Sequence, residues 1–358
     1  MKKILLFVIL LIPFNVSAIS ASSAIVMDLN SSRIIYEANI HEQRLIASIT
    51  KIMTCIVTIE NVDIDKKVKV DEDVLKAFGS AIYIEVGEEL TIKDLLMGLM
   101  LRSGNDAAIV LAKNVAGSMD EFVYLMNELA SNIGMKDTIF YNNHGLDEGE
   151  YKGNISTAYD MALLTKYAMN NKTFRNIFKT KEYITKSSYK TYKWKNKNKL
   201  LHRYDYITGG KTGFTKKARR TLVTTASKNN INLVIVTLND PNDFQDHITL
   251  YENAFNKYKA QLVLDKKNFK IKKDTFYKNN ILYIKHDYYL PIKDDELKDI
   301  KIKYVLTKNK HAINNDIVGQ ANIYLNNKIM HKANIYFKKI HHKKKSFLSR
   351  LSGWLKNG

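Results

Sequence analysis

The chain has 358 residues and a formal net charge of +20, from 56 lysines and arginines against 36 acidic residues. That length exceeds what one compact core usually holds, and so strong a positive charge implies an anionic partner, either nucleic acid, anionic lipid or an acidic wall polymer. The single cysteine, Cys55, excludes an intramolecular disulfide; in its apolar stretch it is predicted to be a small buried core residue, with a reactive thiol as the alternative.

Residues 1–18 have the layout of a secretory signal peptide. Lys2 and Lys3 form a charged start, 4–14 is an apolar run, and 16–18 offers the small residues of a cleavage site. The run is shorter than the roughly 20 apolar residues of a membrane span, although an uncleaved anchor remains the alternative. Cleavage removes two lysines and leaves +18. We expect an exported, periplasmic or extracytoplasmic protein, and export argues against nucleic acid as the partner.

Residues 19–258 mix strand and helix patterns. The predicted elements are strands at 24–28 and 33–36, helices around 95–100, 107–111 and 122–129, a hairpin of 221–226 and 231–238, and a closing helix at 251–258. Strands at both ends with helices between them predict an α+β domain, in which a helical cluster packs against one antiparallel sheet.

Three short motifs follow one another in this region: Ser48-Ile49-Thr50-Lys51, Ser103-Gly104-Asn105 and Lys211-Thr212-Gly213. Taken singly, each has an ordinary interpretation, such as a helix N-cap, a turn or a solvated charge. In this order behind an export signal, they favour an enzyme that attacks an amide bond with a serine.

Ser48 and Lys51 are the predicted nucleophile and base. Their three-residue spacing places them one turn apart on the same face of a helix. A serine hydroxyl is a weak nucleophile until a base takes its proton, and lysine can do so only as the neutral amine, which requires burial or a nearby cation. Lys211 is the candidate cation, and the backbone N–H of Ser48 is a candidate for an oxyanion hole.

The second and third motifs are predicted to face the same cleft. Ser103-Gly104-Asn105 lies between two helical patterns as a turn, where a hydroxyl and an amide can relay a proton and hold a substrate amide. Lys211 and Thr212 suit a carboxylate, through a point charge and a hydroxyl. The preceding Gly209-Gly210 is predicted to leave room for a substrate along the strand edge.

Residues 259–337 are predicted to form a small β domain. Apolar and polar residues alternate at 269–272, 281–285, 300–304, 321–325 and 335–337, which is typical of strands with one exposed face. Nothing in this region suggests chemistry, so a spacer or an interaction module is the favoured interpretation.

Residues 338–358 form a basic tail. An apolar stripe of helical spacing comprises Phe347, Leu348, Leu351, Trp354 and Leu355. Such a helix, behind several lysines, is predicted to lie on an anionic membrane surface, which would make the protein peripheral on the outer face of the cytoplasmic membrane; a solvated tail is the alternative. The adjacent His341 and His342 have no visible third ligand, so no metal site or other cofactor is expected.

The motif set is the signature of penicillin-binding proteins and class A β-lactamases. The longer strings 47–54, 103–108, 143–147 and 211–215 resemble those of the D-alanyl-D-alanine carboxypeptidases, the low-molecular-mass penicillin-binding proteins. The resemblance is close over residues 22–258, and the β domain and tail match that family in layout. It implies a β-lactamase/penicillin-binding-protein-like catalytic domain.

The resemblance also implies a reaction. Ser48 would attack the carbonyl between the last two D-alanines of a peptidoglycan stem peptide, water would release the acyl group, and β-lactams would inhibit covalently by acylating Ser48. The implied roles are Lys51 as base, Ser103 as proton donor to the leaving D-alanine, Asn105 and Gly213 in substrate binding, Lys211 and Thr212 as carboxylate ligands, and the N–H groups of Ser48 and Phe214 as the oxyanion hole.

One departure from the family and three rival functions stay open. Many relatives carry a basic residue after the last core strand for the substrate carboxylate; here 239–243 has none, and Arg219 or Arg220 is the candidate substitute. A class A β-lactamase would need a Glu-x-x-Leu-Asn string, which the chain lacks. A DD-endopeptidase or transpeptidase would use the same residues, and a non-catalytic wall-binding protein is the rival outside enzymology.

Overall fold

The structure is a computed structural model that describes residues 19–147, 153–271 and 274–340. Its contacts divide the chain into two compact units: the first holds the described residues up to Met27 together with 34–228 and 232–254, and the second holds 28–33, 229–231 and the described residues from Phe255 onward. The predicted signal peptide lies outside the described residues, as does the predicted tail beyond residue 340.

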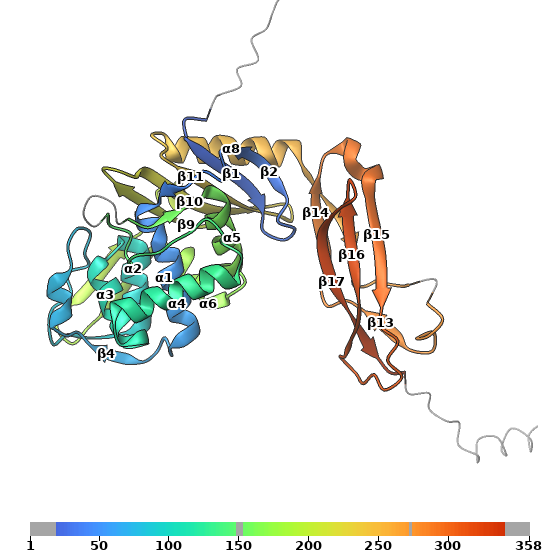
Figure 1. The fold of residues 1–358 in the computed structure, drawn as a ribbon, viewed down its shortest axis with the longest axis horizontal. Helices are drawn as coiled ribbons and strands as arrows, with labels where there is room; N and C mark the ends of the chain where they lie inside the picture. The colour runs from blue at the N-terminus through green and yellow to red at the C-terminus, as the bar shows by residue number, and fades with distance from the viewer. Residues whose placement is uncertain (1–18, 148–152, 272–273, 341–358) are drawn as a thin grey trace, which may run out of the picture. The chain divides into compact units, whose positions relative to one another are not determined.

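A five-stranded sheet forms the centre of the first unit, in the order β2-β1-β11-β10-β9. Its strands are β1 (Ser23–Asp28), β2 (Ile34–Ala38), β9 (Ile207–Thr215), β10 (Arg219–Lys228) and β11 (Ile231–Leu238). The β1–β2 and β9–β10 pairs are antiparallel. All six residues of β1 are buried, because α8 (Asp243–Lys257) covers one side of the sheet and a helical cluster covers the other (Figure 1).

The helical cluster surrounds α1 (Lys51–Asn61), which contacts α2 to α6. The other helices are α2 (Ile92–Arg102), α3 (Asn105–Ala116), α4 (Met119–Asn132), α5 (Ala158–Ala168), α6 (Lys172–Phe178), α7 (Leu200–Arg203), and the short 3₁₀ turns η1 (Ala47–Thr50) and η2 (Glu72–Lys76). Three small strand pairs complete the unit: β3 (Arg44–Leu45) with β6 (Ile155–Ser156), β4 (Lys67–Lys69) with β5 (Glu89–Thr91), and β7 (Glu182–Lys186) with β8 (Thr191–Lys195). The predicted α+β class is confirmed.

The closing helix begins eight residues earlier than predicted, at Asp243 instead of 251. Its first turns bury Asp243, Asp246 and His247, which are polar, so apolar periodicity does not reveal them. His247 lies between the hydroxyls of Thr224 and Thr237, at 2.7 and 3.0 Å. Contacts with the sheet, invisible in the local sequence, therefore extend this helix.

The second unit is built from strands around its own apolar core, which includes Leu290, Ala321, Ile323 and Ile335. Its elements are β12 (Lys259–Leu264) paired with β14 (Tyr288–Ile292), the 3₁₀ turn η3 (Asp294–Asp299), and a sheet of β13 (Ile281–Tyr283), β17 (Lys328–Lys338), β16 (Ile317–Leu325) and β15 (Ile300–Leu306), in that order.

The strand predicted at 269–272 is wrong for its described residues 269–271, which belong to no sheet. The side chains of Phe269 and Ile271 instead pack on the core of the second unit without joining a ladder. The pairing of β12 with β14 was not predicted. Within the described part of the chain, no helix is long and apolar enough to cross a membrane.

Candidate active site

The three sequence motifs meet at one cleft of the first unit, with a volume of about 390 Å³. Its lining residues are Ser48, Ser80, Ser103, Lys197, Lys199, Thr212, Gly213, Phe214, Arg220, Asp243 and Phe244. The three remaining predicted site residues, Lys51, Asn105 and Lys211, are buried beside this lining. All eight predicted site residues therefore lie in one place, although the first and the last motif are more than 150 residues apart in the sequence.

Ser48 lies in the η1 turn, directly before α1 begins at Lys51. The preceding Ala47 has φ +48°, in the left-handed region that costs a non-glycine residue energy. Thr50 Oγ1 donates to the Ala47 carbonyl at 2.8 Å, and Asn154 Nδ2 donates to Thr50 Oγ1 at 3.0 Å. Hydrogen bonds from neighbouring segments thus hold the strained turn that presents the serine.

Lys51 has the surroundings of a neutral base. Its Nζ lies 3.3 Å from Ser48 Oγ and 2.7 Å from Asn105 Oδ1, and it also contacts the carbonyl oxygen of His144. Burial lowers the pKa of Lys51 well below its usual value, and the positive charges of Lys211 and Lys197 lower it further. An amine that loses its proton readily and touches a serine hydroxyl can activate that hydroxyl.

Lys211 joins the third motif to the second. Its Nζ donates to Ser103 Oγ at 3.1 Å and to the Thr212 carbonyl at 2.7 Å. Burial, with a contribution from the charge of Lys197, lowers the pKa of Lys211 to about 7. Ser103 follows α2 with φ +65°, and this left-handed turn places its hydroxyl in the cleft. The predicted turn between two helices is confirmed.

Asn105 connects the base to the cleft wall. Its Oδ1 accepts from Lys51, and its Nδ2 donates to the Phe78 carbonyl at 2.6 Å. Its backbone N–H donates to the Ser80 carbonyl at 2.7 Å. These contacts orient the side chain of Asn105, so that its Oδ1 faces the amine of Lys51.

Gly213 is required where β9 passes Ser48, the predicted nucleophile. A Cβ on Gly213 would lie 2.4 Å from Thr221 Oγ1 and 2.9 Å from the backbone nitrogen of Ser48, so no larger residue fits. The next residue on this edge strand, Phe214, also lines the cleft. The close approach brings the backbone of β9 beside the N–H of Ser48, which is the arrangement expected of an oxyanion hole.

The prediction that Gly209 and Gly210 leave room for a substrate along the strand edge is wrong. A Cβ on Gly209 would lie 2.2 Å from Phe178 of α6, and one on Gly210 would lie 2.3 Å from Asn198 Nδ2. Internal packing therefore demands these glycines, and they do not provide space for a substrate.

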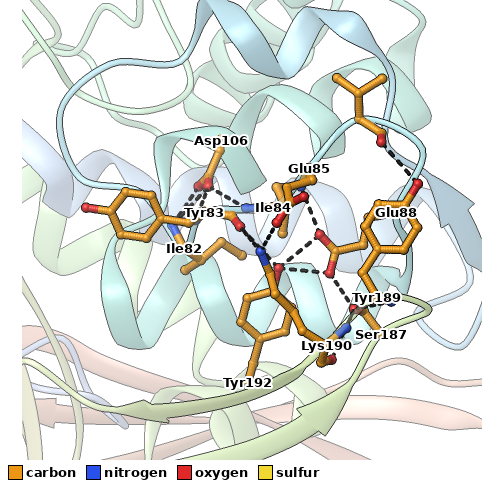
Figure 2. A network of polar contacts seen from close by, with 11 residues as sticks. Ile82, Tyr83, Ile84, Glu85, Glu88, Asp106, Ser187, Tyr189, Lys190 and Tyr192 are labelled. Atoms are coloured by element: carbon orange, nitrogen blue, oxygen red, sulfur yellow. Dashed lines mark hydrogen bonds and ion pairs between the residues drawn. The ribbon is translucent and has the colours of Figure 1, made fainter.

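Asp106 fixes a segment that the sequence did not single out. Its carboxylate accepts from the backbone N–H groups of Ile82 and Tyr83 at 2.9 and 2.7 Å (Figure 2). Tyr83 has φ +61°, so its turn needs such support. The same segment carries Ser80 into the cleft lining. The only sequence feature that could have pointed to Asp106 was its position directly after the second motif.

Glu88 continues this network beside the segment, to the right in Figure 2. Its side chain is fully buried and accepts from the Tyr192 hydroxyl at 2.9 Å, from the Ser187 hydroxyl, and from the Glu85 N–H at 2.8 Å. Lys190, which lies in the β7–β8 hairpin with Ser187 and Tyr192, forms an ion pair with Glu85. The β7–β8 hairpin therefore anchors one wall of the cleft.

Positive charge dominates the cleft lining, where Lys197, Lys199 and Arg220 accompany the single acid Asp243. Lys197 Nζ donates to Ser80 Oγ at 3.1 Å. In the sequence, Lys197 and Lys199 were indistinguishable from solvated charges, whereas Arg220 was one of the two candidates for binding the substrate carboxylate. Among the described residues, no group of three His, Cys, Asp or Glu side chains could hold a metal ion. The positive charge of the lining suits an anionic ligand.

Comparisons with known proteins identify the family to which the two units are similar. A family model described as D-alanyl-D-alanine carboxypeptidase matches residues 13–242, and one described as penicillin-binding protein 5, C-terminal domain, matches residues 258–343. The chain is 32% identical over 306 residues to D-alanyl-D-alanine carboxypeptidase DacF of Bacillus subtilis, covering 82% of this chain and 78% of DacF.

Two solved structures show the likeness of fold. Penicillin-binding protein 5 of Haemophilus influenzae matches with a TM-score of 0.72 at 24% identity, over 90% of this chain and 97% of its own. A variant of the Streptomyces DD-transpeptidase matches with a TM-score of 0.64 at 31% identity, over 67% of this chain and 99% of its own.

Proposed function

The chain belongs to the D-alanyl-D-alanine carboxypeptidase family, and from that premise we propose how its residues carry out the reaction. The enzyme is a serine carboxypeptidase that removes the terminal D-alanine from peptides ending in D-Ala-D-Ala. One observation supports the proposed roles of Ser48 as nucleophile and Lys51 as base. The buried amine of Lys51 lies 3.3 Å from Ser48 Oγ and has a lowered pKa.

In the proposed mechanism, neutral Lys51 takes the proton of Ser48 as the oxygen attacks the carbonyl of the scissile amide. The N–H groups of Ser48 and Phe214 stabilise the oxyanion. Ser103, which contacts Lys211, gives its hydroxyl proton to the amine of the leaving D-alanine as the amide bond breaks, and it regains a proton from Lys51, which returns to the neutral form. Water then attacks the acyl group on Ser48, and the same proton route runs in reverse.

Substrate recognition is proposed to use the polar groups along β9. Thr212 and Gly213 line the cleft beside Ser48, and Lys211, in its protonated form, adds a positive charge behind them. The proposed substrate is a peptidoglycan stem peptide, and a β-lactam is a covalent inhibitor that stops at the acylated serine. No metal or other cofactor takes part in this scheme.

The decisive experiment incubates the protein with a peptide ending in D-Ala-D-Ala and measures free D-alanine. We expect release by the wild type, none by Ser48→Ala, and none after penicillin treatment. Release that survives Ser48→Ala would refute the proposed nucleophile. Absence of both release and a penicillin adduct would favour a non-catalytic wall-binding protein, and rapid turnover of penicillin would favour a β-lactamase.

A second candidate is transpeptidation or DD-endopeptidase action at the same serine. The fold likeness to the Streptomyces DD-transpeptidase favours it, because an amine can replace water as the group that attacks the acyl-enzyme. Product analysis with an added amine acceptor and with cross-linked stem peptides separates these reactions from simple hydrolysis.

Localisation is a proposal that rests on the two ends of the sequence. We propose export through residues 1–18 and attachment of residues 338–358 to the outer face of the cytoplasmic membrane. The attachment predicts sedimentation with anionic liposomes; equal sedimentation after removal of residues 346–358 would contradict it.

A further inference from the structure

We propose that Arg220 supplies the permanent positive charge that binds the substrate's terminal carboxylate, and that Asp243 is its positioning residue. The inference rests on the proposed function and identifies which residue of this chain replaces the basic side chain missing from 239–243. Of the two arginines that the sequence offered, only Arg220 lines the cleft.

The register of the sheet places Arg220 near Thr212. Leu222 of β10 lies opposite Thr212 of β9, and Arg220 lies opposite Phe214. Because side chains alternate between the faces of a strand, Thr212 and Arg220 share a face as diagonal neighbours, about 7–8 Å apart at Cα and within reach of a long side chain. One carboxylate can therefore meet the Thr212 hydroxyl and the Arg220 guanidinium together.

The beginning of α8 holds the guanidinium in place. Arg220 Nη2 lies 2.8 Å from Asp243 Oδ1, and the Arg220 Cζ lies 5.6 Å from the centre of the Phe244 ring. The side chain of Asp243 is only 4% exposed, whereas that of Arg220 is 44% exposed. A guanidinium has five N–H donors and the ion pair uses one nitrogen, so the exposed part can bind a second carboxylate in fork geometry.

The other cations of the site are less suited to this role. Lys211 already donates to Ser103 and to the Thr212 carbonyl, and its pKa of about 7 means that part of the population is neutral at neutral pH. Lys197 donates to Ser80 on another part of the lining. An arginine guanidinium, by contrast, is permanently charged and presents a planar fork that matches a carboxylate.

The test measures binding in the Ser48→Ala background, so that its outcome does not depend on turnover. Calorimetry compares two probes, a peptide ending in D-Ala-D-Ala with a free carboxylate and the same peptide with a C-terminal amide. We expect Arg220→Gln to weaken binding of the carboxylate peptide by roughly 10- to 100-fold, as for the loss of one charge-assisted hydrogen bond, and to leave the amide peptide within about 2-fold. Arg220→Lys should recover part of the loss.

Two controls separate this role from charge in general and from misfolding. Arg219→Gln removes the same charge one residue away and should leave both affinities unchanged. The Arg220→Gln change alone would leave the Asp243 carboxylate buried and unpaired. The double variant Arg220→Gln with Asp243→Asn avoids this, and it should still discriminate poorly between the two peptides.

Four outcomes would overturn the proposal: equal weakening for both peptides, no weakening, the same effect from Arg219→Gln, or no preference for the carboxylate in the Ser48→Ala parent. Absence of D-alanine release by the wild type, with Arg220-dependent binding intact, would instead refute the proposed reaction alone.

Discussion

A Cβ atom placed on Gly145 would lie 2.0 Å from the carbonyl oxygen of Ala47, the residue before the proposed nucleophile Ser48. Gly145 has φ +83°, and its N–H donates to Asn142 Oδ1 at 2.7 Å. The loop that contains Gly145 therefore fits tightly beneath the strained turn that presents Ser48.

Gly145→Ala should displace the Ala47 carbonyl and with it the Ser48 hydroxyl. We expect a loss of about 1–3 kcal/mol in the free energy of unfolding from overpacking, together with a large fall in the rate of acylation by penicillin. The matched control is Gly117→Ala, because Gly117 has φ +82° but no atom within 4 Å of its added Cβ. Comparable loss of acylation in both variants would show that backbone strain alone, without the clash, is responsible.

Lys197→Gln should change the pH at which the serine becomes reactive. Burial is the main cause of the lowered pKa of Lys51, and the charges of Lys211 and Lys197 contribute. Removal of the Lys197 charge therefore raises the pKa of Lys51. Since acylation needs the neutral amine, the acidic limb of the pH–acylation profile should move to higher pH. Lys199→Gln, a change in the same cleft lining, should leave the limb in place; an unmoved limb in Lys197→Gln contradicts the electrostatic account.

Glu88→Gln should destabilise the wall of the cleft. The Glu88 carboxylate accepts from the hydroxyls of Tyr192 and Ser187 and from the Glu85 N–H, and an amide would turn one of its acceptor groups into a donor facing other donors. We expect a loss of about 1–3 kcal/mol, as for a buried polar group left unsatisfied, measured by denaturant unfolding. The exposed neighbour Glu89 is the control. A Glu89→Gln variant as unstable as Glu88→Gln would contradict the role of the buried network in stability.

His247 should make the protein less stable in acid. Burial lowers the pKa of His247 to about 3, from 6.5 in the unfolded chain. Above pH 6.5 both states are neutral and the full stability is present; between pH 6.5 and 3 only the unfolded state binds the proton, so His247 costs up to about 1.4 kcal/mol per pH unit. The free energy of unfolding, measured across this window, should fall less steeply with decreasing pH in His247→Gln than in the wild type. Substitution of the exposed His202 should leave this pH dependence unchanged.

The reaction class could be predicted from the sequence because its chemistry is partly local. Ser48 and Lys51 are three residues apart, and helical geometry alone makes them neighbours. The turn at Ser103 and the strand at Lys211 could also be predicted, since each is bounded by strong periodic patterns. By contrast, the sequence assigned Gly209 and Gly210 to substrate access, although Phe178 and Asn198 require them.

By itself, the sequence determined the α+β class and the order of the motifs, and it predicted Ser48 and Lys51 as nucleophile and base, because these features depend on spacing and periodicity within short segments. Only the tertiary structure decided that Lys51 is buried beside Lys211, that Arg220 and not Arg219 lines the cleft, and that α8 begins at Asp243. Each of these properties depends on contacts between segments distant in the chain, where burial and neighbouring charges set the pKa of a group and the availability of its side chain.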